Sequence, residues 1–444
     1  MSNEILVIGG GPAGIEAARE AAKVGLRVTL VSAGPVGGRA GWHSLLPSKV
    51  WLAAAEAAQQ GGAGADSESP AVDVQVILDD LATVKKAWNG QELVSLDDLD
   101  VTVLQGAAVF SPGGEVRVLD GQGELTASFK DIPAIVASGS VPVFPPALKP
   151  DGRRVIAPRL LSKLAKLPQS MLVVGAGATG CEAAYLFNAL GVSVTWIVDQ
   201  YGILPRFAPW VGETLGEALR KQGVTIVSGE MVADLEREEA KVTAILVGGS
   251  RYEAQMAFVA IGRRSDLDAL NLAAAGLEVG ADGRIQVDEY GRTLNPSIYL
   301  IGDAEGGVMT ANKAQAQGRI AARKLAGRET APFDERLVIQ PVYTEPQVAQ
   351  VGDVSGEVSL SVPFARSLKA HLLPDGEGLL QLYYDESDGR ILGAAAVGPH
   401  AADVLSPVLV AMRLDGRLDD LAGLYAGYPS LSEVAFVAAR EVVR

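Results

Sequence analysis

The stretch EILVIGGGPAGIEAAREAAKVGLRVTLVSAG, residues 4–34, decides the fold. It opens with a short apolar run rich in Val, Ile and Leu, which is typical of a parallel strand buried on both faces. A glycine-rich turn, an alanine-rich helical segment and a second apolar run follow in that order. The stretch therefore predicts a strand–turn–helix–strand unit, and hence an α/β protein.

The stretch SMLVVGAGATGCEAAYLFNALGVSVTWIVDQ, residues 170–200, repeats the same plan. In both units the helix opens with the pattern G-x-G-x-x-G, formed by Gly9, Gly11 and Gly14 and by Gly175, Gly177 and Gly180. The first glycine allows the turn, the second lets a pyrophosphate approach the backbone, and the third lets the helix pack on the strand. The helix N-terminus offers N–H donors to the phosphates. Two such motifs in this context predict two dinucleotide sites.

The composition of the 444-residue chain excludes several classes of partner. Lys and Arg number 38 against 53 Asp and Glu, a net charge of −15, so we expect no nucleic-acid partner, which would need clustered basic residues. No apolar run approaches the ~20 residues of a membrane-spanning helix, and the acidic start MSNE does not resemble a secretory signal. We therefore expect no membrane span, a cytoplasmic location and no metal site.

The segments that follow the two units predict where the chain changes domain. IVASGSVPVFPP (135–146) ends a strand in a Gly/Ser turn and then prolines, which indicates a crossing into a second domain. FVAIGRR (258–264) is the corresponding exit. From about residue 333 the pattern changes to alternating strands and then to helices over 401–415 and 430–443, which indicates a separate α+β domain.

Three shorter segments complete the predicted organisation. GGAGADSESP (61–70) has the composition of a surface loop, and residues 72–95 are predicted as a helix. IYLIGDAEG (298–306) is predicted as a buried strand that ends in Gly-Asp.

Several motifs, in chain order, together resemble those of the FAD-dependent pyridine nucleotide–disulfide oxidoreductases, the family of dihydrolipoamide dehydrogenase, glutathione reductase and mercuric reductase. They are GGGPAG, GG…PSK, the A-S-G-S turn, GAGATGCE, AIGRR, IGDAEG and YPSLSE. The resemblance implies two Rossmann-like dinucleotide-binding domains, for FAD and for NAD(P), and a C-terminal α+β dimerisation domain, so a homodimer is expected. The implied parts are FAD domain 1–145, NAD(P) domain 146–265, FAD domain 266–332 and dimerisation domain 333–444.

The resemblance also implies which residues bind the cofactors. The first glycine motif would hold the FAD pyrophosphate, and the second would hold the nicotinamide nucleotide. Gly302 and Asp303 would bind the ribityl–phosphate region of FAD. The further FAD contacts implied are Ser32, Ala108, Ser138, Gly139, Met309, Thr310 and Ala311. The further contacts implied for the nicotinamide nucleotide are Asp199 and Gly262.

Lys49 and Glu182 match the family's buried ion pair beside the flavin N5 atom and the nicotinamide. Hydride that arrives at the flavin places negative charge on its N1–C2 side, and a nearby ammonium group stabilises that charge. In an apolar pocket such a lysine needs a carboxylate partner to stay charged. Both residues are therefore expected to be catalytic.

The loop VGGRAGWHSLLPSK, residues 36–49, departs from the family because Ala40 and Leu45 occupy the two thiol positions. Neither side chain can attack a disulfide, since only a thiolate does so. The single cysteine, Cys181, follows the second glycine motif in a helix, where a buried small residue is the expected interpretation.

A second departure lies near the C-terminus, in GYPSLSE (427–433). The family carries a His-Pro pair there, and Tyr428 takes the place of its acid–base histidine, with Glu433 following. A tyrosine with a pKa near 10 is a poor base at neutral pH, so Tyr428 either packs at an interface or donates a hydrogen bond to an acceptor. The Tyr-Pro pair and Trp42-His43 resemble the soluble pyridine nucleotide transhydrogenases, in part only, because those enzymes usually keep one loop cysteine.

The choice of nucleotide depends on the residues that end the second strand of each unit. An acidic residue usually binds the adenosine ribose there, but Ser32 and Val198 occupy these positions, with Asp199 next to Val198. No Arg or Lys lies within 198–204, although Arg206 is close. We expect NAD(H) rather than NADP(H).

These features predict an FAD-dependent enzyme that passes hydride from NAD(P)H to FAD and on to a non-disulfide acceptor. A quinone, a second pyridine nucleotide and an electron-carrier protein all remain open as acceptors. One alternative is a flavoprotein electron-transfer subunit of a larger redox complex. Another is a dihydrolipoamide dehydrogenase, against which the absent thiols argue.

Overall fold

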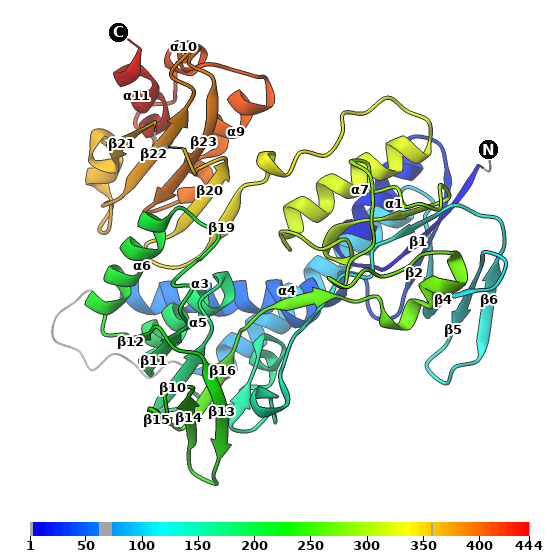
Figure 1. The fold of residues 1–444 in the computed structure, drawn as a ribbon, viewed down its shortest axis with the longest axis horizontal. Helices are drawn as coiled ribbons and strands as arrows, with labels where there is room; N and C mark the ends of the chain where they lie inside the picture. The colour runs from blue at the N-terminus through cyan, green and yellow to red at the C-terminus, as the bar shows by residue number, and fades with distance from the viewer. Residues whose placement is uncertain (1–2, 62–72, 357, 444) are drawn as a thin grey trace.

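The structure, a computed structural model, describes residues 3–61, 73–356 and 358–443. Of the loop predicted over 61–70, only Gly61 is described, and it ends a helix; the remainder lies outside the described residues. Figure 1 shows the first glycine unit at one end of the molecule, the second at the other, and the C-terminal region above the second. The predicted α/β fold class is confirmed.

The first glycine unit lies in a parallel sheet of order β18–β7–β1–β2–β3. Its strands are β1 (Glu4–Ile8), β2 (Arg27–Ser32), β3 (Thr102–Gln105), β7 (Ala134–Val136) and β18 (Ile298–Leu300). Alternate residues of β1 enter two different cores, Ile5 and Val7 on one face and Leu6 and Ile8 on the other. Both faces are buried, as the apolar runs predicted.

Helices cover one face of this sheet and a small sheet covers the other. Helices α1 (Pro12–Lys23) and α7 (Ala311–Leu325) pack side by side on the face of Ile5 and Val7. The opposite face is covered by antiparallel strands β4 (Ala107–Ser111), β5 (Glu115–Leu119) and β6 (Leu125–Phe129). Residues before 145 and after 265 therefore share one sheet; the exact domain boundaries remain a prediction.

The second glycine unit repeats this arrangement in a parallel sheet of order β12–β11–β10–β16–β9. Its strands are β9 (Val155–Ile156), β10 (Ser170–Val174), β11 (Ser193–Val198), β12 (Thr225–Ser228) and β16 (Met256–Val259). Helices α5 (Ala178–Ala189) and α6 (Pro209–Lys221) pack on one face. The other face is covered by β13 (Val232–Arg237), β14 (Val242–Leu246) and β15 (Arg251–Ala254).

The two crossings between these regions lie side by side. Strands β8 (Ser140–Pro142) and β17 (Arg263–Ser265) pair antiparallel, with Ser140 opposite Ser265. The chain thus leaves the first sheet and returns to it at one place. This pairing brings together the two segments whose sequences predicted a crossing and an exit.

The C-terminal region forms an antiparallel sheet of order β19–β20–β23–β22–β21 with short helices. Its strands are β19 (Gln340–Val342), β20 (Val348–Gly352), β21 (Ser359–Pro363), β22 (Leu379–Tyr384) and β23 (Ile391–Val397). The helix predicted over 401–415 is two helices, α8 (Ala401–Val404) and α9 (Ser406–Arg413). Helices α10 (Leu418–Ala422) and α11 (Glu433–Val442) follow. Helix α11 corresponds to the helix predicted over 430–443 and begins three residues after the predicted start.

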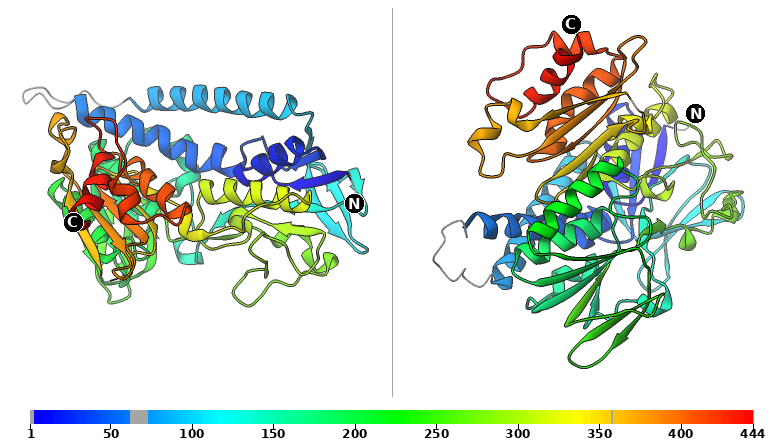
Figure 2. Two further views of the ribbon diagram at one scale, coloured as in Figure 1. Left: turned by 90° about the horizontal axis from the view of Figure 1, so that it is seen from above. Right: turned by 60° about the vertical axis from the view of Figure 1, so that its left-hand side comes forward.

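Two long helices connect the glycine units. The short helix α2 (Gly38–His43) leads into α3 (Leu45–Gly61), and α4 (Val74–Asp97) lies beside α3 along one side of the molecule (Figure 2). Trp51 of α3 and Ile77 of α4 belong to the same core as Phe187 of the second unit. Helix α3, which begins within the loop of residues 36–49, is therefore anchored on the second glycine unit.

Within the described ranges, no helix combines the length and the apolar character that crossing a membrane requires.

The anchoring of α3 can be tested at Trp51, which is fully buried. Trp51→Ala should lower the free energy of unfolding by about 4 kcal/mol, the usual cost of a cavity of this size. Trp51→Phe should cost less than half of that, because the indole N–H makes no hydrogen bond among the described residues. Chemical denaturation measures both, and equal losses would contradict this packing.

Candidate active site

The first glycine turn is shaped by close backbone contacts at two of its three glycines. Gly9 has φ of +117°, and a Cβ there would lie 2.2 Å from the carbonyl oxygen of Ala137. A Cβ on Gly14 would lie 1.8 Å from the carbonyl oxygen of Gly9. A Cβ on Gly11 would meet nothing within 4 Å. The first and third glycines therefore serve packing, and the second leaves open space at the helix N-terminus.

The second glycine turn has the same geometry. Gly175 has φ of +107°, and a Cβ there would lie 2.4 Å from the carbonyl oxygen of Ala260. A Cβ on Gly180 would lie 2.0 Å from the carbonyl oxygen of Gly175, whereas Gly177 again faces open space. The repeat in the sequence is thus a repeat in the structure. Both turns can admit a pyrophosphate against bare backbone.

Residues near the first turn fit the remainder of an FAD molecule. The buried hydroxyls of Ser138 and Thr310 have no hydrogen-bond partner among the described residues. Gly139, with φ of +78°, has open space where a Cβ would be. Buried hydroxyls without partners are costly, and the phosphates, ribityl hydroxyls and ring of FAD offer partners for them. The residues present therefore fit this cofactor.

Asp303 lies in a polar network that reaches across the crossing strands. The Ser140 hydroxyl donates to the Asp303 carboxylate at 2.5 Å, and the Nε of Arg263 donates to the Ser140 hydroxyl at 2.8 Å. The Ser265 hydroxyl donates to the Asp303 carbonyl oxygen at 2.9 Å. Burial lowers the pKa of the Arg263 guanidinium, and the Asp303 charge opposes that change. Neither Ser140 nor Arg263 was predicted as a site residue. Both lie in motifs that carry the family resemblance, the A-S-G-S turn and AIGRR.

Other residues predicted to contact FAD lie in different surroundings. Ser32 is 3% exposed, and its hydroxyl donates to the carbonyl oxygen of Gly34 at 2.7 Å. The side chain of Ala108 packs in the core beneath the first sheet, so only its backbone can face a ligand. Gly302, with φ of +67°, directly precedes Asp303, and Ala311 begins helix α7. Their roles in cofactor binding stay predictions.

The structure brings Lys49 and Glu182 together. The Nζ of Lys49 lies 2.7 Å from Oε1 of Glu182, and the same oxygen accepts the backbone N–H of Tyr343 at 3.0 Å. The Lys49 ammonium also lies 4.2 Å from the centroid of the Tyr343 ring. Burial and the Glu182 charge raise the pKa of Tyr343. Tyr343 was missed in the sequence, because nothing local marks it as a neighbour of residues so distant in the chain.

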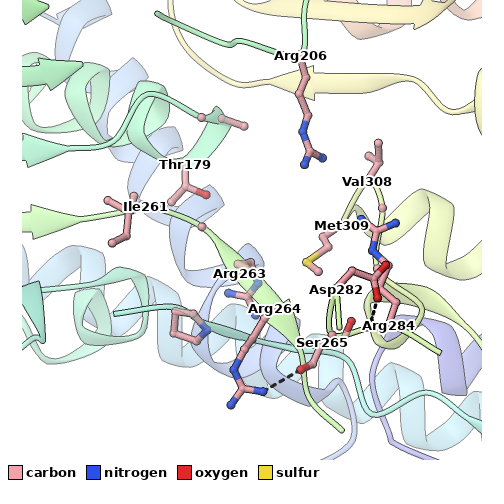
Figure 3. Close-up of a pocket in the computed structure, with 18 of the residues that line it drawn as sticks. Thr179, Arg206, Ile261, Arg263, Arg264, Ser265, Asp282, Arg284, Val308 and Met309 are labelled. Atoms are coloured by element: carbon pink, nitrogen blue, oxygen red, sulfur yellow. Dashed lines mark hydrogen bonds between the residues drawn. The ribbon is translucent and has the colours of Figure 1, made fainter. Parts of the chain in front are cut away.

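A cleft of about 1330 Å³ joins the second glycine turn to the predicted flavin-binding segment. It is lined by six predicted site residues, Gly175, Gly177, Asp199, Gly262, Met309 and Thr310. Figure 3 shows Thr179, Arg206 and Met309 facing this cleft from three separate segments of the chain. Residues expected to bind nicotinamide and flavin therefore share one space, as hydride transfer between the two rings requires.

The residues that bear on nucleotide choice also line this cleft. The carboxylate of Asp199 lies at its wall and accepts the backbone N–H of Tyr201 at 2.9 Å. The exposed Arg206 lies at the wall too. Both a ribose acceptor and a potential 2′-phosphate partner are thus present.

A second cavity, of about 560 Å³, lies on the side of the thiol positions. Ala40, Leu45 and Lys49 all line it, together with Trp88 of α4. It shares no lining residue with the larger cleft. The Lys49 side chain is therefore accessible from a space that the nucleotide residues do not reach.

The C-terminal candidates do not join this site within one chain. Tyr428 is 71% exposed, and neither it nor Glu433 lines either cavity. Glu433 begins helix α11, and its Oε2 atom is buried with no hydrogen-bond partner among the described residues. Their catalytic roles remain predictions.

The surroundings of Cys181 and His43 give neither residue a catalytic partner among the described residues. Cys181 is fully buried, its thiol donates to the carbonyl oxygen of Ala176 at 3.6 Å, and burial raises its pKa. His43 is exposed at the end of α2, and partial burial together with the charges of Lys85 and Arg39 lowers its pKa. His43 is therefore neutral at pH 7. Among the described residues no cluster of His, Cys, Asp and Glu could hold a metal ion.

Comparison with known families matches nearly the whole chain. The sequence model described as "Pyridine nucleotide-disulphide oxidoreductase" matches residues 3–318. The model of the dimerisation domain of that family matches residues 338–439.

Individual relatives carry two kinds of name. The dihydrolipoyl dehydrogenase of Chlorobaculum tepidum is 33% identical, over 99% of this chain and 97% of its own. A protein named NAD(P)H dehydrogenase (quinone) from Mycobacterium tuberculosis is 28% identical, over 100% of this chain and 94% of its own. The crystal structure of LpdA from Mycobacterium tuberculosis superposes with a TM-score of 0.93, at 28% identity and with both chains fully covered.

The two glycines of the second turn should respond differently to alanine. Gly177→Ala should keep the wild-type melting temperature, because its Cβ meets no protein atom, but should weaken NADH binding about tenfold or more by occupying the pyrophosphate space. Gly180→Ala should lower the melting temperature, because its Cβ meets backbone. Thermal unfolding and calorimetric titration measure both. Wild-type NADH affinity in Gly177→Ala would show that the nucleotide binds elsewhere.

Proposed function

The chain belongs to the pyridine nucleotide–disulphide oxidoreductase family, whose members are FAD-dependent, and we propose that it transfers hydride from NAD(P)H to FAD and then to a non-disulfide acceptor. One observation carries this proposal. The Lys49–Glu182 pair is complete, while Ala40 and Leu45 occupy the thiol positions beside it. The residues for the nicotinamide half of the reaction are thus kept, and those for the disulfide half are replaced.

The protein's own groups have distinct parts in the nicotinamide half-reaction. The second glycine turn would hold the nucleotide pyrophosphate, and the cleft would lead the nicotinamide toward Met309 and Thr310. FAD, when bound, supplies a ring that accepts two electrons as hydride and releases them singly or together. Lys49 would stabilise the negative charge that develops there, and Glu182 would keep the lysine charged and oriented.

Three kinds of acceptor are compatible with this reaction: a quinone, a second pyridine nucleotide and an electron-carrier protein. The relative named NAD(P)H dehydrogenase (quinone) supports the first. The relatives named dihydrolipoyl dehydrogenase support disulfide chemistry, but this chain has one cysteine, and it is buried in helix α5 rather than placed in the segment of Ala40 and Leu45. No dithiol can form, so we exclude lipoamide from the proposal.

We also propose NAD(H) as the preferred nucleotide and a homodimer as the working form. Asp199 supports the first, since its carboxylate lies at the wall of the cleft where it can accept ribose hydroxyls. The match to the dimerisation domain supports the second, as do the exposed Tyr425 and Tyr428 between helices α10 and α11. The expected cytoplasmic location stays a prediction.

The hydride-transfer proposal is tested by Lys49→Met. The variant should bind FAD but be reduced by NADH about 100-fold more slowly, the usual effect of removing one group that stabilises transition-state charge. Anaerobic stopped-flow spectroscopy of flavin bleaching measures the rate. Lys86→Met, at an exposed lysine of α4, is the matched control and should be reduced like the wild type.

Two results would contradict the proposal. An unchanged reduction rate in Lys49→Met would remove Lys49 from the mechanism. Substantial turnover with lipoamide would overturn the assignment of a non-disulfide acceptor.

A further inference from the structure

The smaller cavity has the size and lining of a site for a small apolar ligand. Its volume of about 560 Å³ lies within the usual range for ligand pockets. Its wall is mostly apolar and aromatic, and the lining residues used below are Ala40, Leu45, Ala53, Trp88, Tyr185 and Tyr343. Three charged residues, Lys49, Glu56 and Glu345, border it.

The position of this cavity connects it to the hydride-transfer residues. It is lined by Ala40 and Leu45, which occupy the two thiol positions, and by Lys49 of the ion pair. Glu345 follows Tyr343 by two residues, and the Tyr343 N–H bonds Glu182. Two extended residues span about 7 Å, so Glu345 and the ion pair border the same small space.

Glu345 is a carboxylic acid of this wall whose pKa lies near neutral pH. Burial, Asp375 and Glu56 raise its pKa to about 7. Its backbone carbonyl accepts the side-chain amide of Gln222 at 2.8 Å, while its carboxylate has no hydrogen bond or ion pair among the described residues. An acid with a pKa near the working pH is the most effective proton donor.

Other groups around the cavity are unsuited to this task. Burial and the charges of Glu345, Glu56 and Asp375 raise the pKa of Tyr185 well above its usual value, and its hydroxyl donates to Gln59 at 3.0 Å. Lys49 is held by Glu182. His43, which is neutral at pH 7, does not line the cavity.

We propose that this cavity binds a small apolar quinone as the electron acceptor and that Glu345 donates the proton its reduction requires. The inference rests on the proposed function, which supplies the hydride equivalent from NAD(P)H. The quinone gains two electrons and one hydrogen from that hydride, and a second O–H bond forms with the Glu345 proton. The carboxylate then takes a proton from water. The sum is NAD(P)H + quinone + H⁺ → NAD(P)⁺ + quinol.

The proton donor is tested with two acceptors in the oxidative half-reaction. The enzyme is first bleached with NADH and then mixed with menadione, a small naphthoquinone, or with ferricyanide, which takes electrons without protons. In the wild type the menadione rate should fall as the pH rises through about 7, because the ionised carboxylate has no proton to give. Glu345→Gln should slow menadione about 100-fold at pH 6 and abolish this pH dependence. Ferricyanide should react with it as with the wild type.

Two further variants separate a proton donor from a structural residue. Asp375→Asn removes a charge that raises the Glu345 pKa, so it should move the midpoint of the menadione profile to lower pH without slowing the reaction at low pH. Glu377→Gln, at an exposed carboxylate of the same loop, should leave the midpoint unchanged. An unmoved midpoint in Asp375→Asn would contradict the assignment of the profile to Glu345.

Binding gives a readout that needs no turnover. Menadione should quench tryptophan fluorescence of the oxidised protein through Trp88, and Ala53→Trp, which fills the cavity, should weaken menadione binding about tenfold or more. Equilibrium dialysis measures that affinity independently of the added tryptophan. Unchanged affinity would place the quinone elsewhere and overturn the inference.

The outcomes also distinguish this inference from the proposed function. Failure of NADH to bleach the wild type would overturn the proposed function. Bleaching followed by a menadione rate that is independent of pH, or equal in Glu345→Gln, would overturn the inference alone. Reoxidation by ferricyanide or a carrier protein, but not by menadione, would likewise exclude the quinone and leave the hydride transfer standing.

Discussion

The ion pair between Lys49 and Glu182 joins two helices and, through a shared carboxylate oxygen, the start of the C-terminal region. Lys49 lies on α3, Glu182 on α5, and the same carboxylate accepts the backbone N–H of Tyr343, which follows the first strand of the C-terminal sheet. Each charge of the pair is largely removed from water and is compensated by the other, so each element constrains the others. Trp51 of α3 packs in the same core as helix α5, and this packing holds Lys49 of α3 beside Glu182 of α5.

Sequence reasoning predicted the two glycine units well because the constraints on them are local. The turn brings Gly14 to the carbonyl of Gly9 within a few residues, so the pattern can be recognised without knowing the remainder of the fold. The Lys49–Glu182 contact was different. It joins residues far apart in the chain, and only the resemblance to a known family connected them.

The features that were missed depend on long-range packing. Glu345 acquires its raised pKa from burial and from Glu56 and Asp375, which lie in separate segments of the chain. Arg263 and Ser140 meet because the two crossing strands pair, and their sequences alone do not indicate a contact with Asp303. Helix α8 ends before α9 within residues 401–415, which were predicted as one helix. In each case the neighbours, not the residue itself, determine the chemistry.

The replacement of both thiols, at Ala40 and Leu45, also changes how many reducing equivalents one subunit can store. A flavin beside a dithiol holds two electron pairs, whereas a flavin alone holds one. On the proposed reaction, a subunit that has accepted one hydride cannot accept another until its acceptor has taken the first. The two half-reactions must therefore alternate strictly. When the acceptor is scarce, the flavin stays fully reduced, because the subunit has no second redox group to hold further electrons.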